Sequence, residues 1–342
     1  MSWTEADYLI VSVNYRTPAR MIMCMKSVAA EIASINNAKM IVVDNVSGDG
    51  SVEMIAAAII ENGWQHWASV VSSERNGGYS YGNNFAIRQA LNSASPPEYI
   101  HLLNPDTEVR ENSLGALKEF MDAHPQAGIA GSRFENPDGS EWNIAFRFPS
   151  IFSEFEKGVC LGPVSKLLRK YVVAMPMGYE SSRVDWLPGA SMVIRRAVFQ
   201  QAGLFDENYF LYCEETDFCL NAARRGWPAY HVPASLVMHI AGDSTGVSSH
   251  NVASAAKPLP CYVFESRRYY FRKNYGAIYA AGADIAWIAG MLLRKLRLLL
   301  ERRRDDNPPN LLSGAFDNSF LFNHAGRAGN QLAAIGQKVG KL

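Results

Sequence analysis

The sequence predicts a doubly wound α/β fold with a mostly parallel sheet and flanking helices, and two observations support this. Over the first 130 residues, short apolar runs alternate with helical patterns. Continuous Val, Ile and Leu runs between helices are typical of parallel strands covered on both faces. The runs are YLIVSVN at 8–14, MIVVDN at 40–45, ASVVSS at 68–73, EYIHLLN at 98–104 and AGIAGS at 127–132.

The remaining elements are expected in the following order. Helices are predicted at about 18–35, 51–62, 80–92 and 113–123. Residues 133–185, rich in aromatic residues, Gly and Pro, are interpreted as an insertion over the binding edge of the sheet, with a basic helix at 163–171. A second block follows, with a strand in 186–196, a short helix near 197–202, an acidic segment at 205–226, an edge strand near 228–232 and a further segment at 237–245.

This pattern predicts one large domain and an extension. We expect the domain to span residues 1–250, with one half at 1–132 and the other at 133–250. Residues 251–342 are expected to form a linker and a basic helical extension.

Composition excludes some classes of protein. Lys and Arg together number 33 and so do Asp and Glu, so nothing global favours nucleic-acid binding. Five cysteines without a C-x-x-C pair argue against a disulfide framework and favour a reducing cytosol. The start lacks a basic-then-apolar signal. Because Asp284 interrupts the apolar run at 275–293, no transmembrane helix is predicted.

Polar side chains follow several of the predicted strands at the point where each strand ends. Ligands of such sheets bind at the carboxyl ends of the strands, so these residues are candidates for one binding site. They are Asn14, Asp44, Asn45, Asn104 and Asp106. Asp44 could accept hydrogen bonds from a ribose or a pyrimidine, or it could simply cap a turn. The turn after the first strand contains no glycine, which argues against a dinucleotide fold.

Two further segments are candidate ligand sites. The glycine-rich stretch from Arg75 to Asn84 opens a helix, where Gly78 lets the backbone approach a ligand and Arg75 could meet a phosphate; a tight turn is the alternative. Asp106 lies in an Asn-Pro-Asp turn, and a carboxylate there is a natural ligand for Mg²⁺ or Mn²⁺ beside a diphosphate.

Clustered acids and one histidine complete the candidate chemistry. Glu214, Glu215 and Asp217 begin an amphipathic helix, where they either interact with the helix dipole or supply a general base. His239 precedes a Gly-Asp-Ser turn and could complete a metal shell, although a lone histidine is often an ordinary buried polar group.

Taken in this order, the segments resemble the family 2 glycosyltransferases of the GT-A fold, in particular the rhamnosyltransferase-like branch. The matching segments are VSVNY at 11–15, IVVDN at 41–45, RNGGYSYGNN at 75–84, LLNPDTEV at 102–109, WLPGASMVIRR at 186–196, FDENYFLYCEETDFCLNAARRG at 205–226 and HIAGDST at 239–245.

The resemblance implies that residues 1–250 are the catalytic domain, with a nucleotide-binding half at 1–132 and an acceptor and catalytic half at 133–250. It also implies a role for each matching residue. It implies that Asp44 contacts the base or ribose, with Asn14 and Arg75 beside it, and that Asp106 and His239 hold the divalent cation. Asn104 stands in place of the first aspartate of the family's D-x-D motif. Glu215 stands where the family's base aspartate falls, with Glu214 and Asp217 as alternatives, while Trp186 and Gly189 belong to the wall under the donor sugar.

The resemblance further implies an inverting transferase of bacterial surface polysaccharide synthesis. Its donor would be dTDP-rhamnose and its acceptor a glycan or a lipid-linked oligosaccharide. A UDP-hexose donor, a nucleotidyltransferase or oxidoreductase on a similar sheet, and an inactive sugar-nucleotide-binding protein are the alternatives.

The basic tail has three possible roles. Between Arg267 and Arg304 there are ten Lys or Arg against two acids, with an apolar stripe at helical spacing. Such a helix, expected over 278–304, could lie on the inner face of the cytoplasmic membrane, pack on the catalytic domain or pair in a homodimer. Arg267, Arg268 or Lys273 could also reach the donor phosphates.

Overall fold

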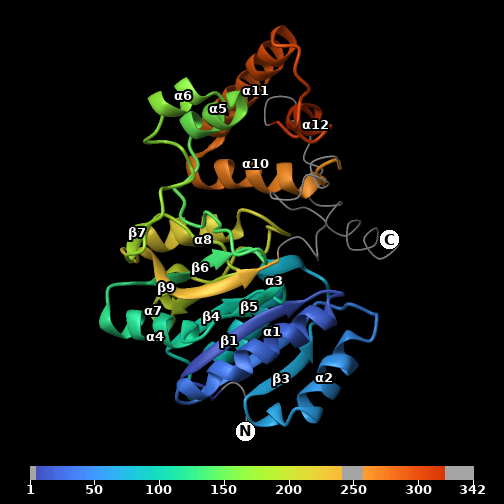
Figure 1. The fold of residues 1–342 in the computed structure, drawn as a ribbon, viewed down its shortest axis with the longest axis vertical. Coiled ribbons are helices and arrows are strands. Elements are labelled where there is room, and N and C mark those ends of the chain that lie inside the picture. Colours follow the sequence, from blue (N-terminus) through green and yellow to red (C-terminus); the bar gives the residue numbers. More distant parts are fainter. Residues whose placement is uncertain (1–4, 241–256, 320–342) are drawn as a thin grey trace. The chain divides into compact units, whose positions relative to one another are not determined.

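The computed structural model describes residues 5–240 and 257–319. The chain divides into two compact units, each described here by itself (Figure 1). Unit 1 consists of Met1–Phe146, Pro176–Tyr209 and Glu214–Ser244, and unit 2 of Arg147–Met175, Phe210–Cys213 and Thr245–Leu342. Residues 147–175, expected to lie over the binding edge of the sheet, are therefore grouped with the C-terminal helices. The expected domain boundary at residue 250 stays a prediction.

Unit 1 is built around one mixed sheet of nine strands. The order is β3-β2-β1-β4-β8-β6-β9-β5, with β7 also paired to β9. The strands are β1 Tyr8–Asn14, β2 Ala38–Asp44, β3 Ala68–Ser72, β4 Tyr99–Leu103, β5 Thr107–Val109, β6 Ile129–Glu135, β7 Ser182–Val184, β8 Ser191–Arg195 and β9 Ala229–His239. The first four strands are mutually parallel, and β8 runs antiparallel between β4 and β6.

Helices cover the sheet as the periodicity predicts. They are α1 Pro18–Glu31, α2 Ser51–Glu61, α3 Gly78–Leu91, α4 Ser113–Ala123, α7 Arg196–Ala202 and α8 Glu214–Ala223, with short 3₁₀ turns at Ile32–Ser34 and Trp64–His66. Helix α2 packs on β3, α3 on β1 and β2, and α4 on β6 and β9. Of the five strands predicted from apolar runs, β1, β2 and β4 are buried almost throughout and β6 over most of its length, while β3 is more exposed.

The prediction of an edge strand near 228–232 is wrong. This segment is the first part of the 11-residue β9, which lies between β6 and β5 in the sheet. Proline is confined mostly to edges and bulges, and the register between β6 and β9 shifts at Ser132, next to Pro233 in the partner strand. The irregularity lets β9 continue to His239, so one strand joins two segments that the sequence separated.

Unit 2 is helical. Its helices are α5 Ile151–Val159, α6 Gly162–Leu167, α10 Cys261–Tyr275, α11 Ala277–Leu300 and α12 Leu311–Asp317. Helix α6 is shorter than the helix expected at 163–171, and α11 ends before residue 304. Glycines let α5 and α11 approach closely, because a Cβ at Gly158 would stand 2.6 Å from the carbonyl oxygen of Trp287.

One buried arginine connects three segments of unit 2. The Arg267 Nε donates to Glu154 Oε2 at 2.6 Å, and its Nη1 donates to Asp284 Oδ1 at 2.6 Å. Its guanidinium also lies 4.4 Å from the centre of the Trp287 ring. The expectation that Arg267 could reach donor phosphates is therefore wrong, because its donors face carboxylates inside the helical unit.

No membrane-spanning segment was predicted, but α11 is long and apolar enough to be a candidate. By length and composition alone it could cross a membrane, although 39% of its most apolar window is buried inside the structure. Asp284, which interrupts the apolar run in the sequence, is 3% exposed and paired with Arg267. A core helix meets the same length criterion.

Replacing Arg267 by Leu should destabilise unit 2 by about 3–5 kcal/mol, because the buried carboxylates of Glu154 and Asp284 would lose their shared partner. Urea unfolding followed by tryptophan fluorescence measures this change. Arg272→Leu is the matched control on the same helix, since Arg272 is exposed. Equal stabilities of the two variants would contradict a structural role for the Arg267 ion pairs.

Candidate active site

The ends of β1 and β2 form a buried polar cluster. Asn14 is the register partner of Asp44, and its side-chain amide donates to Asp44 Oδ1 at 2.7 Å. The Ser47 hydroxyl donates to the same oxygen at 2.5 Å, and the Ser47 backbone N–H donates to Asp44 Oδ2 at 2.9 Å. Asp44 is 2% exposed, so these three donors fix the orientation of its carboxylate.

The backbone around this cluster is strained. Arg16 and Val46 both adopt φ = +57°, which is uncommon for residues other than glycine and unfavourable for a β-branched side chain. Arg16 also holds the turn after β2, because its backbone N–H donates to Ser47 Oγ at 2.9 Å. Strain of this kind concentrates at ligand sites, which agrees with the expectation that Asn14 and Asp44 lie in one site.

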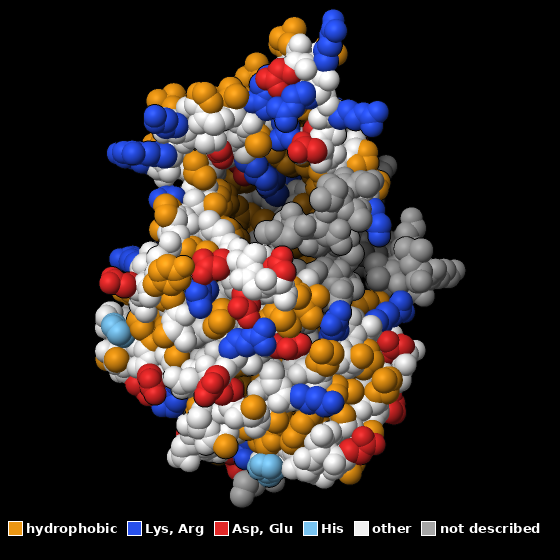
Figure 2. Space-filling view, in the orientation of Figure 1, with side chains coloured by type: hydrophobic (Ala, Val, Ile, Leu, Met, Phe, Trp, Pro, Cys, Tyr) orange, Lys and Arg blue, Asp and Glu red, His pale blue; other side chains and the backbone are white. Residues whose placement is uncertain are grey.

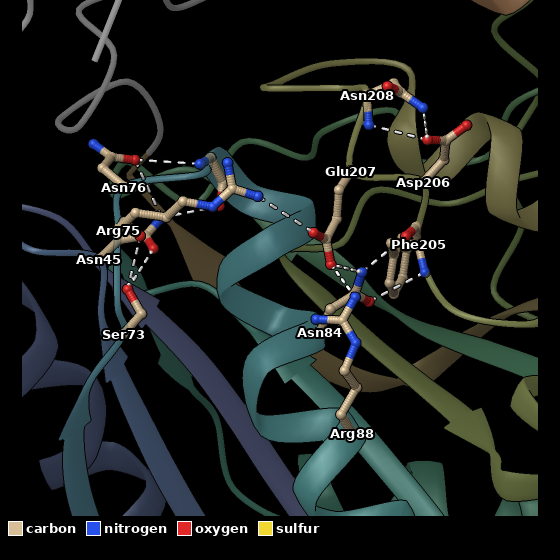
Figure 3. A network of polar contacts seen from close by, with 11 residues as sticks. Asn45, Ser73, Arg75, Asn76, Asn84, Arg88, Phe205, Asp206, Glu207 and Asn208 are labelled. Atoms are coloured by element: carbon tan, nitrogen blue, oxygen red, sulfur yellow. Dashed lines mark hydrogen bonds and ion pairs between the residues drawn. The ribbon is translucent and has the colours of Figure 1, made fainter. Parts of the chain in front are cut away.

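The glycine-rich turn is tied to β2 through Asn45. The Asn45 amide donates to the Gly78 carbonyl at 2.9 Å, while Ser73 Oγ donates to the Asn45 side-chain oxygen at 3.1 Å (Figure 3). Gly78 has φ = +81°, and a Cβ at Gly82 would stand 2.8 Å from a methyl group of Val13. The glycines therefore serve both a left-handed turn and close packing of α3 on β1.

Arg75 is the most exposed of the predicted binding residues. Its guanidinium lies 4.5 Å from the centre of the Tyr81 ring and 3.7 Å from Glu207 Oε2 (Figure 3). Glu207 also accepts from Arg88 and from the Asn84 amide. With 66% of its side chain exposed, Arg75 can change partners easily, so a role beside Asp44 stays a prediction.

Asp106 and His239 come together across two strands. Thr107 is the register partner of His239, and His239 Nε2 lies 3.3 Å from Asp106 Oδ1. Both residues are buried, and His239 packs 4.7 Å from the Trp142 ring and 5.5 Å from the Phe134 ring. Its Nδ1 is buried without a hydrogen-bond partner among the described residues.

This pair fits one side of a divalent-cation site. Two ligands about 2.1 Å from an octahedral ion lie roughly 3 Å apart, close to the observed separation of 3.3 Å. In the described part of the chain no group of three or more His, Cys, Asp or Glu side chains is placed to hold a metal. Asp106 and His239 together could offer two ligands, a number that suits Mg²⁺ or Mn²⁺ bound largely through water and substrate phosphates.

Asn104 and Asp106 occupy the turn between β4 and β5. The Asn104 backbone N–H donates to the Ala190 carbonyl at 3.0 Å, and Thr107 Oγ1 donates to the Asn104 carbonyl at 2.6 Å. These bonds hold the turn against the segment before β8. The position of Asn104 agrees with the expected binding edge, while its ligand stays a prediction.

Gly189 links the predicted base to α3. Its backbone N–H donates to Glu215 Oε1 at 3.1 Å, and its carbonyl accepts from the Tyr79 hydroxyl at 2.9 Å. Burial raises the pKa of Glu215, and hydrogen bonds from its own backbone and from Gly189 oppose that rise. Glu215 is therefore held at one oxygen and has a raised proton affinity, as a general base requires.

Tyr79 lies within the field of both halves of the site. Burial raises its pKa well above 10, and the negative charges of Glu215, Glu214 and Asp106 add to the rise. The Tyr79 hydroxyl is held by the same Gly189 that binds Glu215. Tyr79 was predicted only as part of a motif, without a role, because a tyrosine in a helix carries no local signal of its tertiary partner.

The other two acids of α8 are more enclosed. Asp217 accepts from the Tyr209 hydroxyl at 3.1 Å and is 4% exposed, and Glu214 is 2% exposed. Glu215 is the least buried of the three, which favours it over its neighbours for contact with a substrate. Trp186 stacks on Phe146 with ring centres 4.5 Å apart, so packing accounts for at least part of its role.

Part of the chain matches the model of a known protein family. Residues 9–171 match the model for glycosyl transferase family 2. An N-acetylglucosaminyl-diphospho-decaprenol L-rhamnosyltransferase of Mycobacterium tuberculosis is 29% identical over 272 residues, covering 76% of this chain and 84% of that protein. The rhamnosyltransferase WbbL of Escherichia coli is 27% identical over 48% of this chain and 61% of that protein.

Solved structures share the fold. GalNAc-T7 with UDP, GalNAc and Mn²⁺ superimposes with a TM-score of 0.57 at 16% identity, over 86% of this chain and 54% of that one. The mannosyltransferase PcManGT from Pyrobaculum calidifontis, in complex with GDP-Man and Mn²⁺, gives 0.55 at 11% identity, over 99% and 88%. The predicted GT-A fold is confirmed, as is the resemblance to rhamnosyltransferases.

Gly189→Ala should destabilise unit 1 by about 1–3 kcal/mol, the usual cost of overpacking. The added Cβ would overlap the Tyr79 hydroxyl and stand 3.2 Å from Glu215 Cγ. In a Tyr79→Ala background the loss of stability caused by Gly189→Ala should be smaller. Chemical unfolding of the wild type, the two single variants and the double variant measures this coupling. Gly178→Ala is the control, because the nearest atom to its Cβ is 4.0 Å away. Equal costs in both backgrounds would contradict the contact.

Proposed function

We propose that this chain, whose residues 9–171 match the model for glycosyl transferase family 2, transfers L-rhamnose from dTDP-rhamnose to a glycan or lipid-linked oligosaccharide. The coarser statement, a glycosyltransferase of polysaccharide or glycan biosynthesis, rests on the family match and the rhamnosyltransferase relatives. The observation that supports the site assignment is the position of Gly189, whose N–H donates to Glu215 and whose carbonyl accepts from Tyr79 at the opening of α3.

The proposed binding roles follow from the geometry of each group. Asp44, fixed by Asn14 and Ser47, presents a carboxylate to the base or ribose. Arg75 and the backbone at Gly78 lie at the opening of α3, where N–H groups favour phosphate oxygens. Asn104, Trp186 and Gly189 contribute to the sugar-binding wall.

Asp106 and His239 would hold the divalent cation, which when bound supplies charge neutralisation for the departing diphosphate. Asp106 carries the negative charge of this pair. His239 is oriented by the rings of Phe134 and Trp142, which limit its rotation. With its proton on Nδ1, His239 would offer the Nε2 lone pair to a cation beside Asp106 Oδ1, which lies 3.3 Å from Nε2.

Glu215 would remove the proton from the acceptor hydroxyl. As that oxygen forms its bond to the anomeric carbon, the carbon–oxygen bond to the diphosphate breaks, and the electron pair leaves with the nucleoside diphosphate. A single displacement of this kind inverts the anomeric configuration. The Gly189 N–H holds one oxygen of Glu215 at 3.1 Å, leaving the other for the incoming hydroxyl.

The donor is the finer part of the proposal, and a UDP-hexose is the runner-up. An oxidoreductase is disfavoured because the turn after β1 lacks glycine. The acceptor proposal places the protein in the cytoplasm, at the inner face of the membrane where lipid-linked sugars would be extended. The homodimer stays a prediction.

A nucleotide panel tests donor binding. The midpoint of thermal unfolding should rise with dTDP and Mn²⁺ more than with UDP or GDP, since a ligand at 100 times its Kd stabilises by about 2.7 kcal/mol. Asp106→Asn should remove most of the Mn²⁺-dependent part, while Asp138→Asn, in an exposed turn, should keep it. If no nucleoside diphosphate shifts the midpoint, the transferase proposal fails.

Glu215→Gln should lower kcat by about 10²–10⁴-fold while leaving the KM for the donor nearly unchanged. In the wild type kcat should rise with pH through a pKa above the usual glutamate value, because burial raises that of Glu215 and the deprotonated form is active. Steady-state rates across pH measure both effects. Glu53→Gln, exposed on α2, is the control; a larger loss in Glu214→Gln or Asp217→Asn would move the base to that residue.

A further inference from the structure

One face of α11 is apolar and has no cover in the described structure. Its side chains recur at helical spacing and are 48–92% exposed, at Ile278, Ile285, Leu292, Leu296 and Leu299. The opposite face is buried, with Ala280, Ala283, Trp287, Ile288, Met291 and Leu298 turned inward. A helix with one packed and one exposed apolar face needs a second apolar phase or partner.

Positive charge accompanies this face. Residues 157–171 contain four Lys or Arg and no acid, whereas Arg302, Arg303 and Arg304 after α11 are balanced by Glu301, Asp305 and Asp306. The positive charge of this surface therefore comes from 157–171. Leu167, on α6, is 82% exposed and Tyr171 is 42% exposed. Figure 2 shows hydrophobic side chains over α5, α6 and α11 with Lys and Arg among them.

The basic segment is fixed beside the C-terminal half of α11. The Arg297 Nη2 donates to the carbonyl of Cys160 at 3.1 Å, at the point where α5 ends and the basic stretch continues. The glycine contact reinforces this arrangement, because a Cβ at Gly290 would stand 2.6 Å from the Phe155 carbonyl oxygen. The start of the basic segment is therefore held next to the helix that carries the exposed leucines.

The buried ion pairs favour an α11 that lies on a bilayer over an α11 that crosses it. Asp284 is at the eighth position of α11 and is bound by Arg267 of α10, which is also bound by Glu154 of α5. A spanning α11 would have to leave these partners and carry a carboxylate into hydrocarbon, which is costly. A helix that keeps its packed face on the protein and inserts only its outer leucines loses none of these contacts.

We propose that the surface formed by the outer face of α11 and the basic segment 157–171 docks on an anionic lipid bilayer, with α11 parallel to the membrane plane. Charge complementarity selects this occupant, since exposed leucines flanked by Lys and Arg match both the acyl region and anionic headgroups. A second copy of the chain would bring the same positive charges together. The surface is independent of the proposed transfer reaction.

Vesicle sedimentation of the full chain, without donor or acceptor, tests this proposal. The protein should pellet with vesicles containing phosphatidylglycerol, at least tenfold more than with pure phosphatidylcholine, and less at high salt. Leu296→Asp/Leu299→Asp should reduce pelleting about tenfold, and Lys166→Glu/Arg169→Glu/Lys170→Glu should abolish the preference for anionic lipid. Met54→Asp/Ile60→Asp is the matched control, because these side chains on α2 are 49% and 65% exposed.

Three outcomes would overturn the proposal. One is equal pelleting of the leucine variant and the α2 control variant. Another is resistance of the membrane-bound protein to alkaline carbonate extraction, which would indicate a spanning helix. The third is a dimer in light scattering that only the leucine substitutions convert to monomer, with no vesicle binding. Nucleotide-induced thermal shifts, measured on the same variants, should be unchanged, so failure here is distinct from failure of the transferase proposal.

Discussion

Burial of carboxylates at the carboxyl edge of the sheet is the constraint on which the rest of the candidate site depends. A buried charge needs hydrogen-bond donors or an opposite charge. Asp44 obtains its donors from the protein, through Asn14 and Ser47. Asp106 instead lies 3.3 Å from His239 Nε2, and among the described residues no lysine or arginine forms an ion pair with it. The first carboxylate is thus prepared for a neutral ligand, and the second for a cation.

Much of the fold could be predicted because the N-terminal strands are continuous apolar runs with helices of regular period. The parallel order of β1, β2 and β4 then brings Asn14, Asp44 and Asn104 to one edge. The strand ending at His239 was harder to predict, since Pro233 and Ser235 interrupt its pattern and gave the appearance of an edge strand and a separate segment. Its antiparallel pairing with β5 is what brings His239 to Asp106, and such non-local pairing has no signal in local periodicity.

Contacts made through the backbone could not be predicted from the sequence. Gly189 was expected to line the donor site, which stays a prediction, and its N–H and carbonyl also connect Glu215 to Tyr79. The contacts of Ser47 with Asp44 follow a turn in which Val46 is left-handed, a conformation that the sequence does not signal. Arg267 illustrates the opposite error, because a basic residue in a basic tail was expected to face phosphate and instead neutralises two buried acids.

The centres of the Trp142 and His239 rings lie 4.7 Å apart. A cation bound at Nε2 would place a charge beside this indole and so change its emission. Trp142 is therefore an intrinsic fluorescent probe beside His239, one of the two proposed cation ligands. Comparison with a Trp142→Phe protein separates its emission from that of the other six tryptophans. Cation binding at His239 can therefore be followed by fluorescence without a label.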